Sequence, residues 1–282
     1  MRKIKRVRIE KVCIRGGIKE VRYYVVSDVH GFYDELIKVL TEQRFFNDKE
    51  PHKLIICGDL LDRGKQTNEL VKFALDLLQK DELIYIRGNH EDLLETLLQD
   101  LSGEFADKAL WGIIQGISYH VHNGTWRSAV DLSGMSVDDI YKDQIKCVDA
   151  VKKSEYFTKL LPNSVDYYET DNYVFVHGWI PVKSVRNTLK YREDWRTASK
   201  ECWNDSRWKC GMDMAVQFKI TEPNKTIVCG HYHTSYGHSV YENKGSEFGV
   251  GADFSPFYAK GIIGLDGCTA WTGEVNCIVI DD

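Results

Sequence analysis

Polar side chains of a few types follow five short apolar runs of this 282-residue chain, each at the point where the run ends. The runs span residues 23–26, 54–57, 83–86, 174–176 and 227–229. The side chains that follow them are Asp28 and His30, Asp59 and Asp62, Asn89 and His90, His177, and finally His231 and His233. Carboxylates, imidazoles and an amide oxygen together suit divalent manganese, iron or zinc. The residue types therefore predict a metal site built from turns that lie far apart in the sequence.

Two metal ions that share one aspartate would lie about 3.5–4 Å apart and would clamp a phosphoryl group between them. Such a pair lowers the pKa of a bridging water, which can then attack phosphorus in line. Glycines flank the candidate ligands, namely Gly31, Gly58, Gly64, Gly88, Gly178 and Gly230. Turns of this kind need a positive φ or a close approach of two backbones, and glycine allows both.

The elements that must position these side chains follow from the apolar pattern. The five runs predict buried strands, because both of their faces are apolar. The first two turns lead into amphipathic patterns over residues 34–40 and 69–78, which predict helices. Repetition of strand, turn and helix indicates parallel strands with helices on the faces of a sheet. Because ligands of such sheets bind beyond the carboxyl ends of the strands, we expect the polar turns to converge there.

Three of the turns carry longer motifs, which are S-D-V-H-G at residues 27–31, G-D-L-L-D-R-G at 58–64 and R-G-N-H-E at 87–91. These motifs resemble those of the calcineurin-like metallophosphoesterases. The branch they are most similar to contains serine/threonine protein phosphatases, phage and bacterial phosphatases, and symmetrical diadenosine tetraphosphatases. The resemblance covers residues 23–92 and 172–235 well. It implies an α/β sandwich of two mixed β-sheets flanked by helices, with residues 1–282 forming a single domain.

The resemblance also implies which residues bind metal. Asp28 and His30 would hold the first ion, and Asp59 would bridge the two ions. The second ion would be held by Asn89, His177 and His231.

Catalytic and phosphate-binding roles follow from the same resemblance. His90 would protonate the leaving oxygen, and Asp62 would orient its imidazole and raise its pKa. Arg63 and Arg87 would bind the phosphate oxygens through paired hydrogen bonds.

Two positions depart from the pattern of the protein-phosphatase branch. Residues 230–233 have the sequence G-H-Y-H, so His233 is either an additional ligand of the first metal ion or a residue at the edge of the pocket. A further phosphate-binding arginine is expected after a tryptophan, and Arg207 is the candidate at a shifted spacing from Trp203. Arg186 and Arg196 are the alternatives for this role.

Residues 91–165 differ from the rest of the chain, because helical patterns over 91–101, 109–117 and 137–161 are interrupted by few strand signals. We interpret this segment as a helical cap inserted at the active edge of the sheet. Residues 261–280 alternate apolar residues with Gly and Thr, which predicts the closing strands of an antiparallel pair. Four tryptophans are predicted mainly to pack in the interior, although some could line a substrate groove: Trp179, Trp195, Trp203 and Trp208.

The composition restricts the partners of the protein. A net charge of −5 argues against general binding to nucleic acid. Residues 1–22 are an exception, because they are strongly basic, and we expect a solvated strand or hairpin face there in preference to an arm for an anionic partner. No apolar run has the length of a membrane span, and the basic N-terminus lacks the apolar region of a secretory signal. We therefore expect a cytoplasmic protein without a membrane partner.

The predicted activity is metal-dependent hydrolysis of phosphomonoesters, with phosphoserine or phosphothreonine in proteins as the favoured substrate. The cofactors would be two divalent metal ions, with manganese favoured and iron or zinc as alternatives. A symmetrical diadenosine tetraphosphatase, or a related hydrolase of nucleotides, is the alternative function, because the same metal core serves both reactions. A non-enzymatic scaffold is disfavoured because His90, Asp59 and Asn89 are all retained. Phosphodiesterase action on nucleic acid is a minor alternative.

Overall fold

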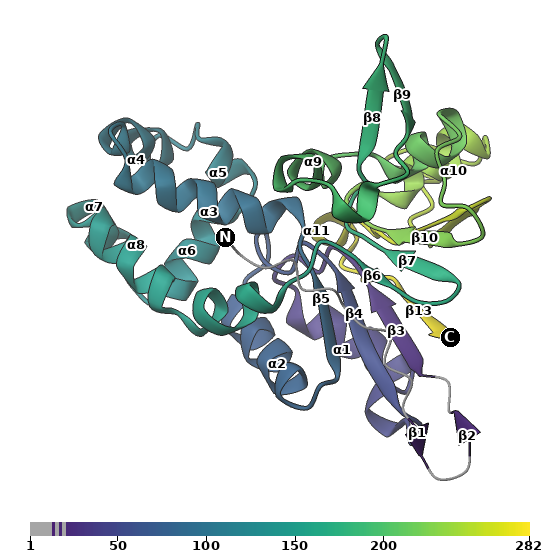
Figure 1. Ribbon diagram of the computed structural model, residues 1–282. Helices are drawn as coiled ribbons and strands as arrows, with labels where there is room; N and C mark the ends of the chain where they lie inside the picture. Colours follow the sequence, from purple (N-terminus) through teal and green to yellow (C-terminus); the bar gives the residue numbers. More distant parts are fainter. Residues whose placement is uncertain (1–12, 15–16, 19–20) are drawn as a thin grey trace.

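The computed structural model of the protein describes residues 13–14, 17–18 and 21–282 (Figure 1). Strands β1 (Cys13–Ile14) and β2 (Gly17–Ile18) pair in antiparallel orientation. The prediction made for the basic segment 1–22 falls largely on residues outside the described part of the chain.

The first sheet has four strands in the order β13-β3-β4-β5. They are β13 (Cys277–Asp281), β3 (Arg22–Val26), β4 (His52–Cys57) and β5 (Leu83–Ile86). Strands β3, β4 and β5 are parallel, whereas β13 runs antiparallel to β3. Helix α1 (Tyr33–Glu42) and helix α2 (Thr67–Gln79) connect the parallel strands, with η1 (Phe45–Asn47) after α1. The predicted strands and helices of this half are confirmed.

The second sheet has five strands in the order β11-β12-β10-β7-β6. They are β11 (Phe257–Ala259), β12 (Ile262–Gly264), β10 (Thr226–Cys229), β7 (Tyr173–Phe175) and β6 (Tyr168–Glu169). Strand β10 is parallel to β7 and β12, and the two edge strands are antiparallel to their neighbours. Both sheets are therefore mixed, as predicted.

The antiparallel pair predicted over residues 261–280 is wrong. Strand β12 pairs with β10 and β11, while β13 crosses to the first sheet and pairs with β3. Alternation of apolar residues marks a strand with unlike faces, but it does not identify the neighbouring strand. The sequence pattern therefore predicted that these residues form strands, but not which strands they pair with.

The two sheets pack face to face, and the alternation of side chains explains how. Tyr23 and Val25 of β3 point between the sheets, where they join Phe175 of β7 and Val228 of β10 in one buried cluster. Val26 of β3 points to the opposite face and packs with the helices. Successive side chains of a strand leave on opposite faces, so a strand that is apolar on both faces fits this position.

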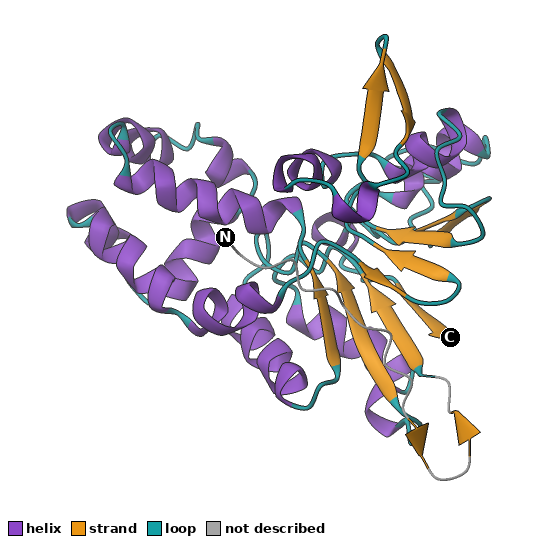
Figure 2. Ribbon diagram, viewed as in Figure 1, coloured by secondary structure: helices purple, strands orange, loops and turns teal. Residues whose placement is uncertain are grey.

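Residues 91–165 contain helices and no named strand, as their helical patterns predicted; Figure 2 shows these helices gathered on one side of the molecule. The helices are α3 (Asn89–Ser102), α4 (Ala106–Ile114), α5 (Tyr119–His122), α6 (Thr125–Ser133), α7 (Val137–Lys142) and α8 (Gln144–Lys153), followed by η2 (Tyr156–Leu160) and η3 (Leu161–Asn163). The helical pattern predicted over 137–161 is interrupted at Asp143, between α7 and α8. The Asp143 side chain accepts a hydrogen bond from the backbone N–H of Lys146 at 2.9 Å and so begins α8.

The remaining elements surround the second sheet. They are the hairpin of β8 (Val182–Val185) and β9 (Thr188–Tyr191), then η4 (Trp195–Thr197), α9 (Lys200–Ser206), η5 (Asp213–Gln217), α10 (Thr234–Tyr241) and α11 (Thr269–Thr272). Figure 1 shows the β8–β9 hairpin projecting from the body of the molecule. None of the helices in the described residues is both long and apolar enough to cross a membrane.

Candidate metal centre

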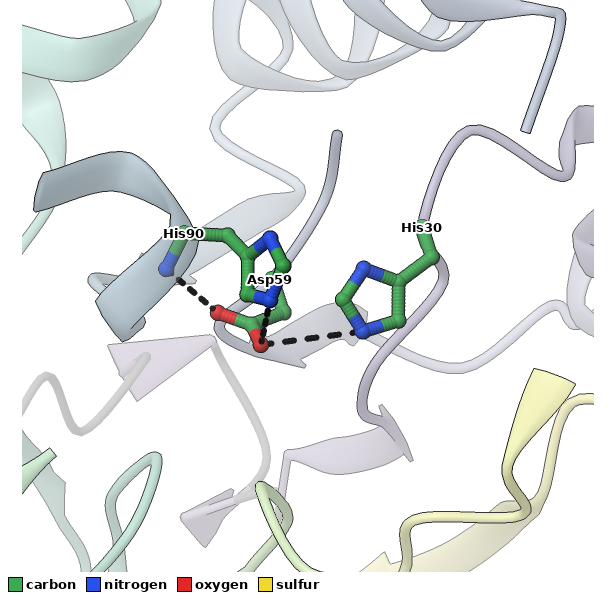
Figure 3. Close-up of side chains that lie close together, drawn as sticks. All are labelled: His30, Asp59 and His90. Carbon is green, nitrogen blue, oxygen red and sulfur yellow. Dashed lines mark hydrogen bonds and ion pairs between the residues drawn. The ribbon is translucent and has the colours of Figure 1, made fainter. Parts of the chain in front are cut away.

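Asp59 lies at the centre of the predicted site, directly after β4. Its Oδ2 atom is 3.7 Å from Nε2 of His30, and its Oδ1 atom is 3.3 Å from Nε2 of His177. Two groups of possible ligand atoms share this carboxylate: one consists of His30, Asp59 and His90, and the other of Asp59, His177 and His231. Figure 3 shows the first group. The position between two groups is the one that a bridging ligand requires.

The first group includes His30 and Asp28 from the turn after β3. The Nδ1 atom of His30 lies 3.1 Å from the carbonyl oxygen of Leu61, to which it donates a hydrogen bond. This bond leaves Nε2 free to face Asp59 and Asp28, whose Oδ1 atom is 3.9 Å away. A second partner that fixes the tautomer is typical of histidines that bind metal.

The second group joins residues from both sheets. His177, after β7, donates from Nδ1 to the carbonyl oxygen of Cys57 at 2.8 Å, so its Nε2 atom carries the lone pair. That lone pair faces Oδ1 of Asn89 at 2.7 Å, and Nδ1 of His231 faces the same oxygen at 2.9 Å. Two lone pairs at hydrogen-bond distance repel each other unless positive charge lies beside them, so this arrangement fits a cation.

The charge on Asp59 supports the same conclusion. Burial raises the pKa of the Asp59 carboxyl well above its usual value, and the carboxylates of Asp28 and Glu91 add to this effect. Burial, followed by the charge of Arg63, lowers the pKa of the His30 imidazole. Both shifts reflect the cost of burying charge at this site, and two divalent cations would offset that cost for the carboxylates.

His90 and Asp62, which the sequence analysis predicted to be the acid and its orienting partner, lie in contact. The Nδ1 atom of His90 donates to Oδ2 of Asp62 at 2.7 Å. The cap holds that carboxylate in turn, because Thr125 and Ser128 of α6 donate hydrogen bonds to it at 2.7 and 2.6 Å. Burial lowers the pKa of the His90 imidazole, but the charge of Asp59 and the bond to Asp62 outweigh burial, so the pKa lies above its usual value.

The turns hold their ligands in unusual backbone conformations. The φ angles of Asp28, His30, Asp59 and His231 are 52°, 51°, 55° and 69°, a region that side chains with a Cβ rarely adopt. Such strain is concentrated at functional sites, where the surrounding structure over-determines it.

Two glycines are required by close approach to these ligands. A Cβ at Gly88 would lie 2.1 Å from Oδ1 of Asp59, and one at Gly230 would lie 2.1 Å from Oδ2 of Asp28. The glycines predicted to flank the ligands therefore include positions where no other residue fits.

Glu91 has a positioning role that the sequence analysis did not assign. Its carboxylate accepts hydrogen bonds from the backbone N–H groups of Gly88, Asp59 and Leu60 at 2.6, 3.0 and 3.1 Å. It thereby caps the start of α3 and ties the turn after β4 to the turn after β5. The signal was a Glu at the third position of the helix, which is typical of a capping box.

The predicted phosphate-binding arginines have different surroundings. Arg63 is exposed, and its guanidinium donates to Nε2 of His90 at 3.2 Å, so it lies beside the acid. Arg87 instead donates to Asp92 at 2.7 Å and to Glu95 at 2.5 Å.

Arg207 is buried and is also held by carboxylates. It donates to Asp92 at 2.7 Å and to Asp166. Asp92 therefore joins Arg87 and Arg207 in one ion-pair network. Of the two alternatives, Arg196 pairs with Glu169 and Glu222, and Arg186 lies exposed between β8 and β9.

His233 is not grouped with the other ligands within the described residues. Its Nε2 atom faces Oε1 of Glu247 at 2.8 Å, and its ring lies 4.6 Å from the ring of Phe248. The tryptophans divide similarly: Trp179, Trp195 and Trp203 are buried in the core, whereas Trp208 is 51% exposed and its ring lies 5.8 Å from that of His231. The structure therefore places one tryptophan at the site.

Together, the two-sheet fold and the buried histidine–carboxylate groups at its strand ends define a protein with a candidate two-metal centre. A family model described as calcineurin-like phosphoesterase matches residues 21–243, and the chain belongs to this family.

Curated relatives match over shorter stretches. A symmetrical bis(5′-nucleosyl)-tetraphosphatase from Buchnera aphidicola is 43% identical over 68 residues, which are 24% of this chain and 23% of the relative. An asymmetrical bis(5′-nucleosyl)-tetraphosphatase from Bacillus subtilis is 28% identical over 144 residues, which are 49% of this chain and 48% of the relative. The matches thus span from about a quarter to about half of the length of these relatives.

A solved structure supports the fold. The cold-active protein-tyrosine phosphatase of a psychrophilic Shewanella has a TM-score of 0.51 and 16% sequence identity, over 94% of this chain and 76% of that chain. At this identity, the similarity concerns the fold alone.

Proposed function

We propose that the protein hydrolyses dinucleoside polyphosphates, and that it does so with two divalent cations bound at the groups that share Asp59. The names of the relatives favour this substrate over the phosphoprotein predicted from the sequence. Manganese and a cytoplasmic location stay predictions.

The observation that carries the proposal is that most of the candidate phosphate-binding arginines are paired with carboxylates. A terminal phosphate dianion on a protein side chain calls for several free guanidinium groups. Arg87 and Arg207 are neutralised by Asp92, Glu95 and Asp166, so Arg63 is left as the arginine beside His90. An internal phosphate of a polyphosphate chain carries less charge than a terminal dianion, and it therefore depends less on such a cluster.

The residues suit hydrolysis of a phosphoric anhydride or ester. Cations bound at the two groups would supply Lewis acidity and an activated water. Arg63 would turn from Nε2 of His90, to which it donates in this structure, to a phosphoryl oxygen, and Nε2 would then hold a proton for the leaving oxygen while Asp62 keeps the ring in place. Because the candidate ligands come from both sheets, the packing of the sheets would fix the cations relative to Arg63 and His90.

The experiment compares two substrates with the manganese-loaded enzyme, with EDTA as the metal-free control. One assay measures nucleotide release from diadenosine tetraphosphate, and the other measures phosphate release from a phosphoserine peptide. We expect a higher kcat/KM for the dinucleotide. Preference for the peptide would contradict the proposal and would restore the phosphoprotein phosphatase, which the exposed Arg63 beside His90 still favours as the second candidate.

A further inference from the structure

Two exposed aromatic rings lie together near the metal centre. Phe248 is 48% exposed and Trp271 is 70% exposed, although both are large and apolar. Their ring centroids are 6.2 Å apart at an interplanar angle of 73°, and Phe254 lies 6.4 Å from Phe248. Single exposed aromatics are common on protein surfaces, but a cluster from separate segments indicates a binding surface.

The segments that carry these rings also hold the metal centre. Thr269, at the start of α11, donates its hydroxyl to the carbonyl oxygen of Asp28 at 2.9 Å, and Trp271 follows two residues later. Phe248 packs at 4.6 Å against His233, which follows the candidate ligand His231 by two residues. The aromatic pair therefore lies on segments that contact Asp28 directly, through Thr269, and the residue two positions after His231, through Phe248.

The loop that carries Phe248 is fixed in place. Glu247 accepts from Nε2 of His233 at 2.8 Å through its side chain and from the hydroxyl of Ser235 at 2.7 Å through its carbonyl oxygen. The backbone N–H of Trp271 donates to the carbonyl oxygen of Cys268 at 2.8 Å. Because the backbone beside both rings is held before any ligand arrives, binding a flat partner would require little ordering of the chain. His233 thereby acts as a positioning residue for the loop.

We propose that Phe248 and Trp271 form a stacking subsite for one nucleobase of a nucleoside polyphosphate. Every base presents a π face, and aromatic side chains bind such faces with little dependence on base identity. The exposed indole ring of Trp208 lies 5.8 Å from the ring of His231. It provides a separate stacking surface for the base at the other end of a dinucleotide. The inference rests on the proposed function, because it names how that substrate is recognised.

The first test uses kinetics with the manganese-loaded enzyme. We compare kcat/KM for diadenosine tetraphosphate with kcat/KM for p-nitrophenyl phosphate, which has no nucleoside, in F248A, W271A and wild type. The ratio should fall about 5- to 150-fold in each variant, the range that loss of one base–aromatic stack produces. Trp111 of α4 is 55% exposed in the cap, so W111A is the matched control and should keep the wild-type ratio. An unchanged ratio in W271A and F248A would overturn the subsite.

The second test separates this inference from the proposed function, because it needs no turnover. Calorimetry measures the Kd of ADP and of pyrophosphate for the manganese-loaded protein. We expect wild type and W111A to bind ADP more tightly than pyrophosphate, and F248A and W271A to lose that difference. Failure to hydrolyse the dinucleotide, together with this preference for ADP, would reject the proposed function and keep the subsite. Equal affinities in wild type would reject the subsite itself.

Discussion

Asp59 faces both candidate metal groups, and a single atom replacement tests that position. Asp59→Asn keeps the shape of the side chain but removes one anionic oxygen. We expect manganese-dependent turnover to fall to background and manganese affinity to fall at least tenfold, as measured by calorimetry. Asp76 is exposed on α2, and Asp76→Asn is the matched control. Retained turnover in Asp59→Asn would remove the bridging role.

The proton held by His90 should matter in proportion to the leaving group. An alkoxide, as in phosphoserine, leaves only when it is protonated, whereas p-nitrophenolate leaves as an anion. We expect His90→Ala to lower kcat by about 10²–10⁴-fold for a phosphoserine peptide and by far less for p-nitrophenyl phosphate. Equal losses on both substrates would show that His90 acts through the metal ligands beside it, and not as an acid.

At the level of residues, the motifs predicted the candidate ligands because each lies in a turn with glycine. The arginines were less predictable. Arg87 and Arg207 were both expected to be free cations. Arg87 pairs with Asp92 and Glu95 in the helix that follows it. Arg207, by contrast, meets Asp92 and Asp166 only once its segment folds against α3 and the residues before β6. The hydrogen-bond partner of His233 could not be predicted either, because Glu247 lies in a loop 14 residues further along the chain.

The first turn of α3 is the element that joins the cap to the metal centre. Glu91 satisfies three backbone N–H groups there, and it is buried. Glu91→Ala would leave buried donors without partners, and we expect the free energy of unfolding to fall by at least about 2 kcal/mol. Urea denaturation measures this change.

The control for that substitution is a glutamate in the same position of another helix. Glu69 is the third residue of α2 but is exposed, so Glu69→Ala removes a similar side chain without leaving buried donors. We expect a change within about 0.5 kcal/mol. Equal destabilisation by the two substitutions would show that the effect of Glu91 is helix capping alone and not support of the metal turns.

Elements with a strong local signal were predictable. Strands β3, β4, β5, β7 and β10 were found from their apolar runs, and α1, α2 and α3 from their amphipathic pattern. The boundaries of the helices and the partners of the strands were not predictable from the sequence. The cap pattern over 137–161 contained no break, because Asp143 can lie on a helix surface as readily as at an N-terminus. The neighbour of β13 depends on contacts that no local pattern records.

At the scale of the whole molecule, the metal centre lies where the two sheets meet. Asp28, Asp59 and Asn89 follow strands of the first sheet, whereas His177 and His231 follow strands of the second. Cations bound between these residues would therefore link the two halves of the sandwich. A ligand that binds only the folded state stabilises it by about 2.7 kcal/mol at 100 times its Kd.

Manganese should accordingly raise the Tm of the whole protein. For a chain of this size, about 2.7 kcal/mol corresponds to a rise of roughly 5 °C at 100 times the Kd, measured by scanning calorimetry against an EDTA-treated sample. His177→Ala removes a ligand of the second sheet and should abolish most of the rise, although ligands of the first sheet remain. Asp76→Asn should keep the full rise. Calorimetry would first confirm that the wild-type protein binds manganese. If its Tm then does not respond to manganese, binding does not depend on the packing of the two sheets. That result would mean that the cation does not connect the sheets.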